Sequence, residues 1–479
     1  MKKHVTMLLV AAMLLTSLTA CGGTAEPETD AAVDTAAETE PVETELTDSL
    51  PEKDFGDRTI RVLTAAEQWQ HFYVNEQTGD VVDDAIYNRN LTVEERFGVV
   101  LEYDVKNGYM AGMADVKTAL SGSVMSGGSD YDLMVGSSSY VMPNVADKLL
   151  TDLYELDYLD LNAPWWLQHI NAEAEIGNKL YFGAGYYGML NIAWGVVTFF
   201  NKALVTDYSL EDPYELVLDG KWTMDTMLEM CEAVVTDVNG DSKFDDQNDV
   251  LGILSSDDYM PSLAISMGHV YSDRNADGSV TVKNADDRIV SINEKIVGIR
   301  NSNFYSSVAH DTYYENLKNA FSDNHGLFLI HRLEHADSEQ FRNMEGYGII
   351  PCVKYDESQQ DYITYVIAEN AGIPSVVTDM EASSIILEAL QFESWKTVRP
   401  AYYDIMLKQK YSSDEISGQM LDIIFEHNTS QFLYMYCRFI DDYPGSQIGI
   451  NENYTSWLQS KITSMQQKLD DLMIKLQED

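Results

Sequence analysis

The chain has 479 residues, with 31 Lys and Arg against 78 Asp and Glu, so its formal charge is −47. Residues 1–20 contribute +2 and residues 22–54 contribute −10, so −39 remains on residues 55–479 and the acidity is not confined to a tail. So acidic a surface repels phosphates and anionic headgroups, which argues against nucleic acid as a partner and against a basic-patch membrane role. A hydrophobic content of 45% excludes disorder of the whole chain, and the length predicts two or more compact lobes.

The N-terminus predicts an export signal followed by a lipid attachment site. Lys2 and Lys3 precede an apolar stretch, roughly residues 5–18, that is too short for a stable membrane span. Leu18-Thr19-Ala20-Cys21 then resembles the lipobox of bacterial lipoproteins. The resemblance implies removal of residues 1–20 and lipidation of Cys21, since more than one acyl chain holds a domain stably at a bilayer. An ordinary signal peptide with an incidental cysteine is the alternative.

Residues 21–54 are expected to form a lipidated, disordered tether. After Cys21 they consist mainly of Ala, Thr, Glu, Asp and Pro and contain almost no large apolar side chain, so folding could not repay the ordering entropy. The remaining cysteines, Cys231, Cys352 and Cys437, have no zinc-type spacing and are expected to be small buried hydrophobic residues. These features predict a lipid-anchored protein on the extracellular face of the cell membrane.

From residue 55 onward the pattern alternates between strands and helices. It predicts strands at 58–66, 99–105 and 131–136, with helices at 83–97 and near 113–125 between them. This order predicts a parallel, doubly wound sheet, in which ligands bind at the carboxyl ends of the strands. Neither strand–helix turn carries a glycine-rich phosphate fingerprint, so a nucleotide cofactor is not supported.

The middle of the chain contains a series of short motifs in a recognisable order. They are Pro164-Trp165-Trp166, the segment 176–185, Phe199-Phe200-Asn201-Lys202, and the segments 220–230, 347–356 and 371–379. In this order they resemble the extracellular solute-binding proteins of bacterial ABC importers, in the mostly sugar-binding group that includes maltose-type receptors. Each motif alone is weak, and their order from about residue 55 to 440 carries the resemblance.

The resemblance implies an α/β protein with the type II periplasmic-binding-protein fold, two doubly wound lobes joined by a hinge. By analogy, the first lobe would comprise 55–190 plus 326–366, and the second 191–325 plus 367–479. The apolar residues of 453–479 predict a terminal amphipathic helix that packs on the second lobe, with a partner-binding coiled coil as the alternative. Trp165 and Trp166 are expected to brace the first lobe or the hinge.

An Asp-rich loop at residues 237–249 predicts a calcium site. Asp237, Asn239 and Asp241 have the 1, 3, 5 spacing of an EF-hand or dockerin-like loop, and Lys243 offers a backbone carbonyl. Ser242 replaces the usual Gly, and Asn248 stands where a bidentate acid is expected, so Asp245 or Asp249 would supply that ligand. A solvated loop of Asx turns after a helix is the alternative.

The string His331-Arg332-Leu333-Glu334-His335 matches the H-x-x-E-H motif of one class of zinc peptidases. That chemistry needs both imidazoles on one helix face, whereas this string directly follows an apolar segment, 326–330, that predicts a strand. We therefore interpret Arg332 and Glu334 as polar groups of a cleft or as surface charges.

Strand ends and the hinge supply the candidate ligand contacts. Sugar rings stack their C–H faces on aromatic planes, and their hydroxyls need planar polar partners, so aromatic, acidic and Arg side chains are the residues of interest. The candidates are Glu67, Trp69, Ser138, Tyr140, Tyr186, Tyr187, Asp257, Asp258, Tyr259, Arg332 and Glu334. For each of these, ordinary packing or solvent exposure is the alternative.

The resemblance therefore predicts a binding protein and not an enzyme. We expect a monomer that captures a mono- or oligosaccharide by hinge closure and delivers it to the permease subunits of an ABC importer. No nucleophile motif is found, but a chain this acidic leaves open a surface glycoside hydrolase or lyase with a carboxylate pair. A cell-surface adhesion or sensor lipoprotein is a third class.

Overall fold

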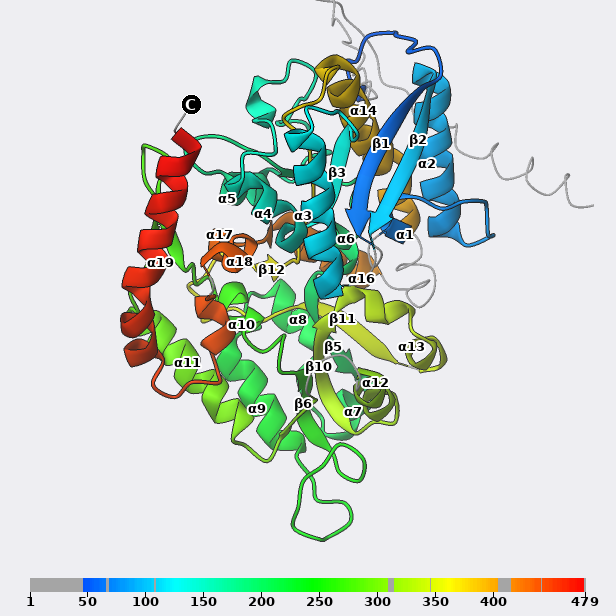
Figure 1. The fold of residues 1–479 in the computed structure, drawn as a ribbon. Helices are drawn as coiled ribbons and strands as arrows, with labels where there is room; N and C mark the ends of the chain where they lie inside the picture. The colour runs from blue at the N-terminus through cyan, green and yellow to red at the C-terminus, as the bar shows by residue number, and fades with distance from the viewer. Residues whose placement is uncertain are drawn as a thin grey trace, which may run out of the picture. The chain divides into compact units, whose positions relative to one another are not determined.

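The computed structural model describes residues 46–65, 69–106, 109–308, 314–344, 346–403, 415–440 and 442–477 (Figure 1). The chain divides into two units, Met1–Thr47 and Asp48–Asp479, and the fold below is that of the second. The predicted signal, Cys21 and nearly all of the predicted tether lie outside the described residues. Within those residues, no helix combines the length and the apolar character needed to cross a membrane.

The first sheet has the strand order β2-β1-β3-β13-β4. β1 pairs in parallel with β2 and β3, while β13 is antiparallel to both β3 and β4. The predicted order of three parallel strands with intervening helices is confirmed. The strands of this sheet are β1 (Arg58–Ala65), β2 (Val99–Lys106), β3 (Leu133–Ser137), β4 (Gly183–Ala184) and β13 (Glu369–Gly372).

The ends of α2 (Val81–Phe97), the helix between β1 and β2, are fixed by its capping residues. The Asp80 carboxylate caps α2 by accepting hydrogen bonds from the N–H groups of Val82 and Asp83. The helix ends at Gly98, whose φ of 58° lies in the left-handed region that glycine adopts without a side-chain clash. The chain then enters β2 at once, so the cap fixes the position of the next strand.

The second sheet has the order β11-β5-β10-β6-β9. β10 is parallel to β6, β6 is parallel to β9, and β5 runs antiparallel to both β10 and β11. Every residue of β5 and β6 is buried, as expected for strands covered on both faces. The strands are β5 (Val196–Asn201), β6 (Leu251–Ser256), β9 (Tyr305–Val308), β10 (Gly326–Arg332) and β11 (Tyr347–Pro351).

Three of the segments that cross between the two sheets lie wholly within the described residues and bear on the site. The first (residues 185–195) runs from β4 to β5, and the second (352–368) runs from β11 to β13. The third (427–431) leads from α16 (Glu415–Glu426), which packs on β11, to α17 (Phe432–Met435), which packs on α4 and α5. The second and third segments pair through the short parallel strands β12 (Thr364–Tyr365) and β14 (Asn428–Thr429).

The pairing differs from the division predicted from the sequence. β10 and β11 belong to the second sheet, although residues 326–366 were assigned to the first lobe, and β13 belongs to the first sheet, although 367–479 was assigned to the second. The physical reason is that the sequence of a buried apolar strand does not show which sheet the strand joins. The exact limits of the lobes remain a prediction.

Helices cover both faces of the first sheet: α2 packs with α14, and α3 packs with α4 (Figure 1). On the second sheet, α9 packs on β6 and α12 on β10. Two short strands, β7 (Ser272–Arg274) and β8 (Val280–Val282), form a separate hairpin. The helices not yet bounded are α1 (Trp69–Phe72), α3 (Tyr109–Met125), α4 (Ser138–Ala146), α5 (Gln168–Ala174), α6 (Leu190–Ala193), α7 (Lys202–Asp207), α8 (Pro213–Leu218), α9 (Met224–Val234), α10 (Ser262–Ser266), α11 (Asp287–Arg300), α12 (Tyr314–Ser322), α13 (Glu339–Asn343), α14 (Met380–Glu393), α18 (Cys437–Ile440) and α19 (Tyr454–Gln477).

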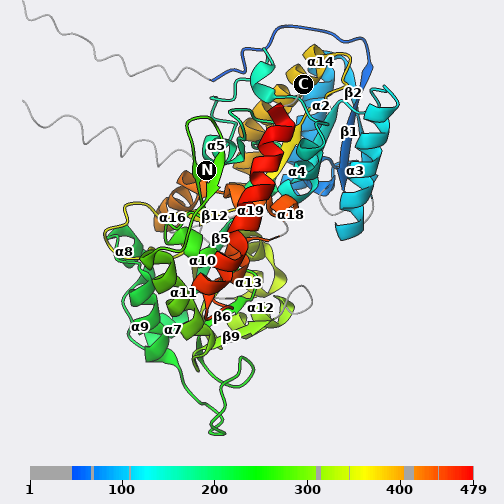
Figure 2. The ribbon, with the colours of Figure 1, turned by 60° about the vertical axis from the view of Figure 1, so that its left-hand side comes forward.

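The predicted terminal helix is present as α19, with a wider set of contacts than expected. It packs on α11 and β8, beside the second sheet, and also on α4 of the first sheet (Figure 2). Lys475 near its end forms an ion pair with Asp147 after α4, at 3.0 Å. α19 therefore touches the helices of both sheets, which differs from the prediction of packing on the second lobe alone.

The tryptophan pair braces the first sheet, as predicted. Trp165 and Trp166 are buried, and their indole N–H groups donate to the two carboxylate oxygens of Glu388 on α14, at 2.7 and 2.9 Å. Two of the three cysteines, Cys231 and Cys352, are buried as expected, and Cys437 is partly exposed.

Candidate ligand-binding site

A cavity of about 640 Å³ lies beside the second sheet and the crossing segments. Its volume falls within the range of small-molecule sites. Aromatic side chains line it together with charged residues and the hydroxyls of Ser262 and Ser446. The aromatic residues are Trp194, Tyr259, Tyr314, Tyr365, Tyr434 and Tyr443, and the charged residues are Asp257, Asp258 and Arg332.

Strand ends and crossing segments position these side chains. Asp257 to Tyr259 follow β6 and Arg332 ends β10, and these two strands are parallel neighbours, so their carboxyl ends meet at one edge of the sheet. Trp194 lies in the first crossing segment and Tyr365 in the second. A ligand in this cavity would therefore touch the second sheet and two of these crossing segments.

Arg332 packs against aromatic side chains of the cavity. Its guanidinium lies 4.3 Å from the Trp194 ring centroid, and 6.0 and 5.9 Å from those of Tyr259 and Tyr314. Glu334 fixes this arrangement, because one carboxylate oxygen pairs with Arg332 Nη2 at 2.7 Å and the other accepts the Trp194 indole N–H at 2.7 Å. Among the described atoms, the buried Nε–H of Arg332 has no acceptor, so the group retains a donor for a ligand.

The acidic residues of the cavity are also engaged. Asp257 pairs with Arg300 at 2.8 Å, and Tyr314 donates its hydroxyl to Asp258 at 3.3 Å. Burial raises the pKa of Tyr259 and of Tyr314, so both hydroxyls remain protonated and neutral. The lining thus offers neutral hydroxyls, one guanidinium and two carboxylates around aromatic faces.

The histidines of the H-x-x-E-H string lie behind the aromatic lining of the cavity. His331 lies within β10, one residue before its end, and His335 lies in a 3₁₀ turn, η2 (Leu333–Asp337), so the string does not form the helix that a zinc peptidase needs. Their rings are 3.9 Å apart, and His331 packs on Tyr259 and Tyr314 at 4.7 and 4.6 Å. Burial lowers the pKa of both imidazoles, that of His335 to about 2, so both are neutral supports of the aromatic lining.

The structure brings together only some of the predicted contacts. Asp257, Asp258, Tyr259 and Arg332 line the cavity, and Glu334 supports Arg332 and Trp194 from behind. Glu67 lies outside the described residues, and Trp69 and Tyr140 are placed only by their backbones, at the start of α1 and within α4.

The other three predicted contacts lie elsewhere in the fold. Ser138 is buried and accepts a hydrogen bond from the side chain of Asn370 at 2.9 Å. Tyr187 is buried, hydrogen-bonded to the Tyr103 hydroxyl at 2.7 Å and packed against Arg89. Tyr186 lines a different, smaller pocket beside Trp166. Their position at predicted strand ends or at the hinge indicated proximity to a cleft but not the direction of the side chain.

Sequence reasoning missed the aromatic residues of the crossing segments and of the chain that follows them. Tyr365, Tyr434 and Tyr443 come from a part of the chain where no periodic pattern indicates the fold. Trp194 sits in an apolar run that predicts only burial. The abundance of Tyr, 29 residues, was the single available signal, and it has no positional information.

The Asp-rich loop forms turns of its own. Asp237 accepts hydrogen bonds from the N–H groups of Gly240 and Ser242, and Asn239 and Asp241 each accept one from the residue two positions on, the latter from Lys243. Asp249 is buried and binds the N–H groups of Val238 and Asp245, closing the loop at its base. In the described part of the chain, no group of three or more His, Cys, Asp or Glu side chains is arranged to hold a metal ion, so calcium remains a prediction.

Comparison with known proteins shows the fold class. No protein-family model and no curated protein sequence matches the chain. Among solved structures, it is similar to a cyclic α-maltosyl-1,6-maltose binding protein from Arthrobacter globiformis (TM-score 0.56, 12% identity, 87% of this chain and 99% of that chain). It is also similar to a Rhizobium etli sugar transporter in an open conformation (TM-score 0.56, 12% identity, 86% and 99%).

A third similar structure is an ABC substrate-binding protein from Listeria monocytogenes in complex with cycloalternan (TM-score 0.51, 13% identity, 87% and 98% covered). Nearly the whole length of each of these proteins is matched. The chain therefore has the two-sheet α/β fold of ABC solute-binding proteins, as its motif order predicted.

Proposed function

We propose that this protein captures an extracellular carbohydrate for an ABC importer. The observation that carries the proposal is the aromatic cavity beside the crossing segments, with Arg332 held against Trp194. Proteins of the same fold are described as bound to cycloalternan or as binding cyclic maltosyl-maltose, which supports a neutral oligosaccharide as the ligand class.

The chemistry of the lining suits such a ligand. Aromatic planes accept the apolar C–H faces of sugar rings, and the Nε–H of Arg332 and the carboxylate of Asp258 can bind hydroxyls. The two carboxylates that line the cavity, Asp257 and Asp258, disfavour an acidic ligand.

Binding requires no covalent step. In our proposal, the ligand enters while the two sheets stand apart and binds more tightly when they approach, so it shifts the population toward the closed state. The importer's permease subunits would recognise that state. We propose a lipid anchor at Cys21, which keeps the binding protein at the outer face of the membrane where the permease operates.

A sugar panel tests the proposal. Calorimetry with neutral oligosaccharides, including cycloalternan and maltotriose, should find at least one that binds and raises the Tm, with compaction by X-ray scattering and no turnover of the sugar. Trp194→Ala should weaken binding about tenfold, because it removes a stacking surface and the partner of Glu334. Trp457→Ala on α19, outside the cavity, is the matched control. Turnover of any glycan would instead support the hydrolase or lyase.

A further inference from the structure

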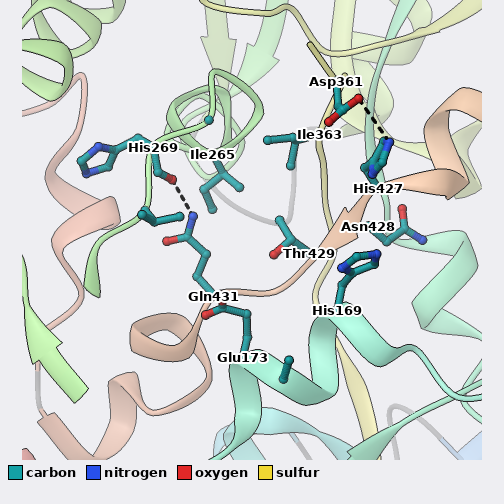
Figure 3. Close-up of a pocket in the computed structure, with 13 residues that line it drawn as sticks. His169, Glu173, Ile265, His269, Asp361, Ile363, His427, Asn428, Thr429 and Gln431 are labelled. Atoms are coloured by element: carbon teal, nitrogen blue, oxygen red, sulfur yellow. Dashed lines mark hydrogen bonds and ion pairs between the residues drawn. The ribbon is translucent and has the colours of Figure 1, made fainter. Parts of the chain in front are cut away.

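A second cavity, of about 320 Å³, lies where the crossing segments meet (Figure 3). Its lining comes from α5, from the stretch between Ile265 and Val270, and from the second and third crossing segments. Ile265 lines this cavity and the aromatic cavity alike, so the two cavities are neighbours. α5 belongs with the first sheet and α10 leads from the second, so the cavity is bounded by elements that hinge motion would move.

Its two carboxylates lie at opposite ends. Figure 3 shows Asp361 at one end and Glu173 at the other, with Ile265, Ile363 and Thr429 between them. Burial raises the pKa of Glu173, against the opposing influence of the Phe432 N–H and of Arg274, so this carboxylate lacks full compensation. Two acids separated by apolar side chains match a molecule with a positive charge at each end and an aliphatic middle.

No Lys or Arg lines the cavity among the described residues. Two guanidinium groups lie behind its wall, but both are engaged with main-chain oxygens. Arg274 donates to the carbonyls of Glu173 and Glu175, and Arg288 donates to that of Met267. The lining itself thus carries no Lys or Arg among the described residues, although the charge of Arg274 acts on Glu173 from behind the wall.

The remaining polar groups of the lining include histidines and amides. Burial lowers the pKa of His269 to about 4, so this imidazole is neutral at neutral pH. The Nε2 of His427 pairs with the Asp361 carboxylate at 3.5 Å, and the side chain of Asp361 is 59% exposed, so this end of the cavity is open to solvent. The ring centroid of His427 is 6.4 Å from that of His169. The side-chain oxygen of Asn428 is buried and has no partner among the described atoms, and the residue lies between this cavity and the smaller pocket that Tyr186 lines. A buried acceptor without a donor is costly, and an N–H donor from a ligand would satisfy it.

We propose that this cavity is a second binding site, for a short aliphatic diamine, with one ammonium at Glu173 and the other at Asp361. Its methylene chain would pack on Ile265 and Ile363, and one ammonium would donate to Asn428. Because the lining joins elements of both sheets, the diamine binds one hinge angle better than others and changes sugar affinity through Ile265 and the crossing segments.

The test uses putrescine as the probe and butane-1,4-diol as its uncharged isostere. Calorimetry on the full chain without sugar, at about 150 mM NaCl to screen surface charge, should show one putrescine site and no binding of the diol. Glu173→Gln with Asp361→Asn should weaken putrescine binding at least tenfold. Asp207→Asn with Glu211→Gln, which removes two exposed carboxylates outside the cavity, should leave it unchanged.

Two further variants make the outcome decisive. Ala172→Trp fills the cavity from α5 without changing a charge, and it should also abolish putrescine binding. Asp258→Asn, in the aromatic cavity, should not. The proposal would be overturned if putrescine did not bind at all or if the diol bound equally well. It would also be overturned if the Asp207/Glu211 control lost as much putrescine affinity as the Glu173/Asp361 variant, or if Asp258→Asn lost putrescine affinity. If putrescine leaves the affinity for sugar unchanged, the proposed coupling between the two cavities is wrong. The Ala172→Trp protein should still bind sugar, so failure of the diamine site can be told apart from failure of the proposed function.

Discussion

Glu388 shows how a single buried carboxylate links packing to pH. It accepts both indole N–H groups of Trp165 and Trp166, yet burial, the largest influence, raises its pKa to about 7 from an ordinary 4.5. A carboxyl group whose pKa is raised by folding binds more protons in the folded state. The free energy of unfolding therefore falls as the pH rises through the window from about 4.5 to about 7.

We expect this residue to contribute about 3 kcal/mol to that pH dependence. Glu388→Gln should remove the contribution and cost about 1 kcal/mol for one lost indole hydrogen bond. Urea unfolding of the two proteins at pH 4.5 and pH 7.5 measures the difference, with Glu229→Gln, exposed on α9, as the control for loss of a carboxylate. Parallel pH profiles for the wild type and Glu388→Gln would contradict this account.

Of the residues predicted for the site, those at the ends of β6 and β10 line the aromatic cavity. Asp257, Asp258 and Tyr259 directly follow β6, and Arg332 ends β10, so their position at strand ends could be predicted, whereas their shared sheet edge is seen only in the structure. Tyr187 does not line this cavity, because the end of a strand does not determine which way a side chain turns. Arg89 and Tyr103, which hold Tyr187 in the core, lie about 90 residues away in the sequence.

At the scale of elements, length decided what the sequence could predict. β1, α2 and β2 are long enough for a period to be visible, and α2 carries its own cap at Asp80. β4, β12 and β14 have two residues each and β13 has four, too few for any period. Their pairing depends on contacts across the whole fold, and for that reason the assignment of segments to sheets differed from the prediction.

The Asp-rich loop is the element whose chemistry remains to be measured. Its carboxylates accept backbone N–H groups, but an oxygen that accepts one hydrogen bond retains a lone pair, so turns and a cation are compatible. We expect Ca²⁺, and not Mg²⁺, to raise the Tm of EGTA-treated protein, and Asp241→Asn to reduce the rise. An unchanged Tm would leave the Asx turns and the buried Asp249 as the full explanation of the loop.

At the scale of the whole molecule, the charge of −39 on residues 55–479 opposes compaction, because acids outnumber bases more than twofold in the chain. We expect the Tm to rise by several degrees between about 20 and 300 mM NaCl as mutual repulsion is screened. Choline chloride at the same ionic strength should give the same rise in Tm. Sucrose at equal osmolality adds no ions, so it should not reproduce this salt-dependent rise.

The same charge also bears on the ligand. A neutral oligosaccharide should bind with an affinity nearly independent of salt, because no net charge is transferred to the cavity, whereas its carboxylated analogue should bind more weakly, and most weakly at low salt. Calorimetry of the two sugars at both salt concentrations measures this. Tighter binding of the acidic sugar at low salt would show that the guanidinium of Arg332, and not the surrounding carboxylates, dominates the field in the aromatic cavity.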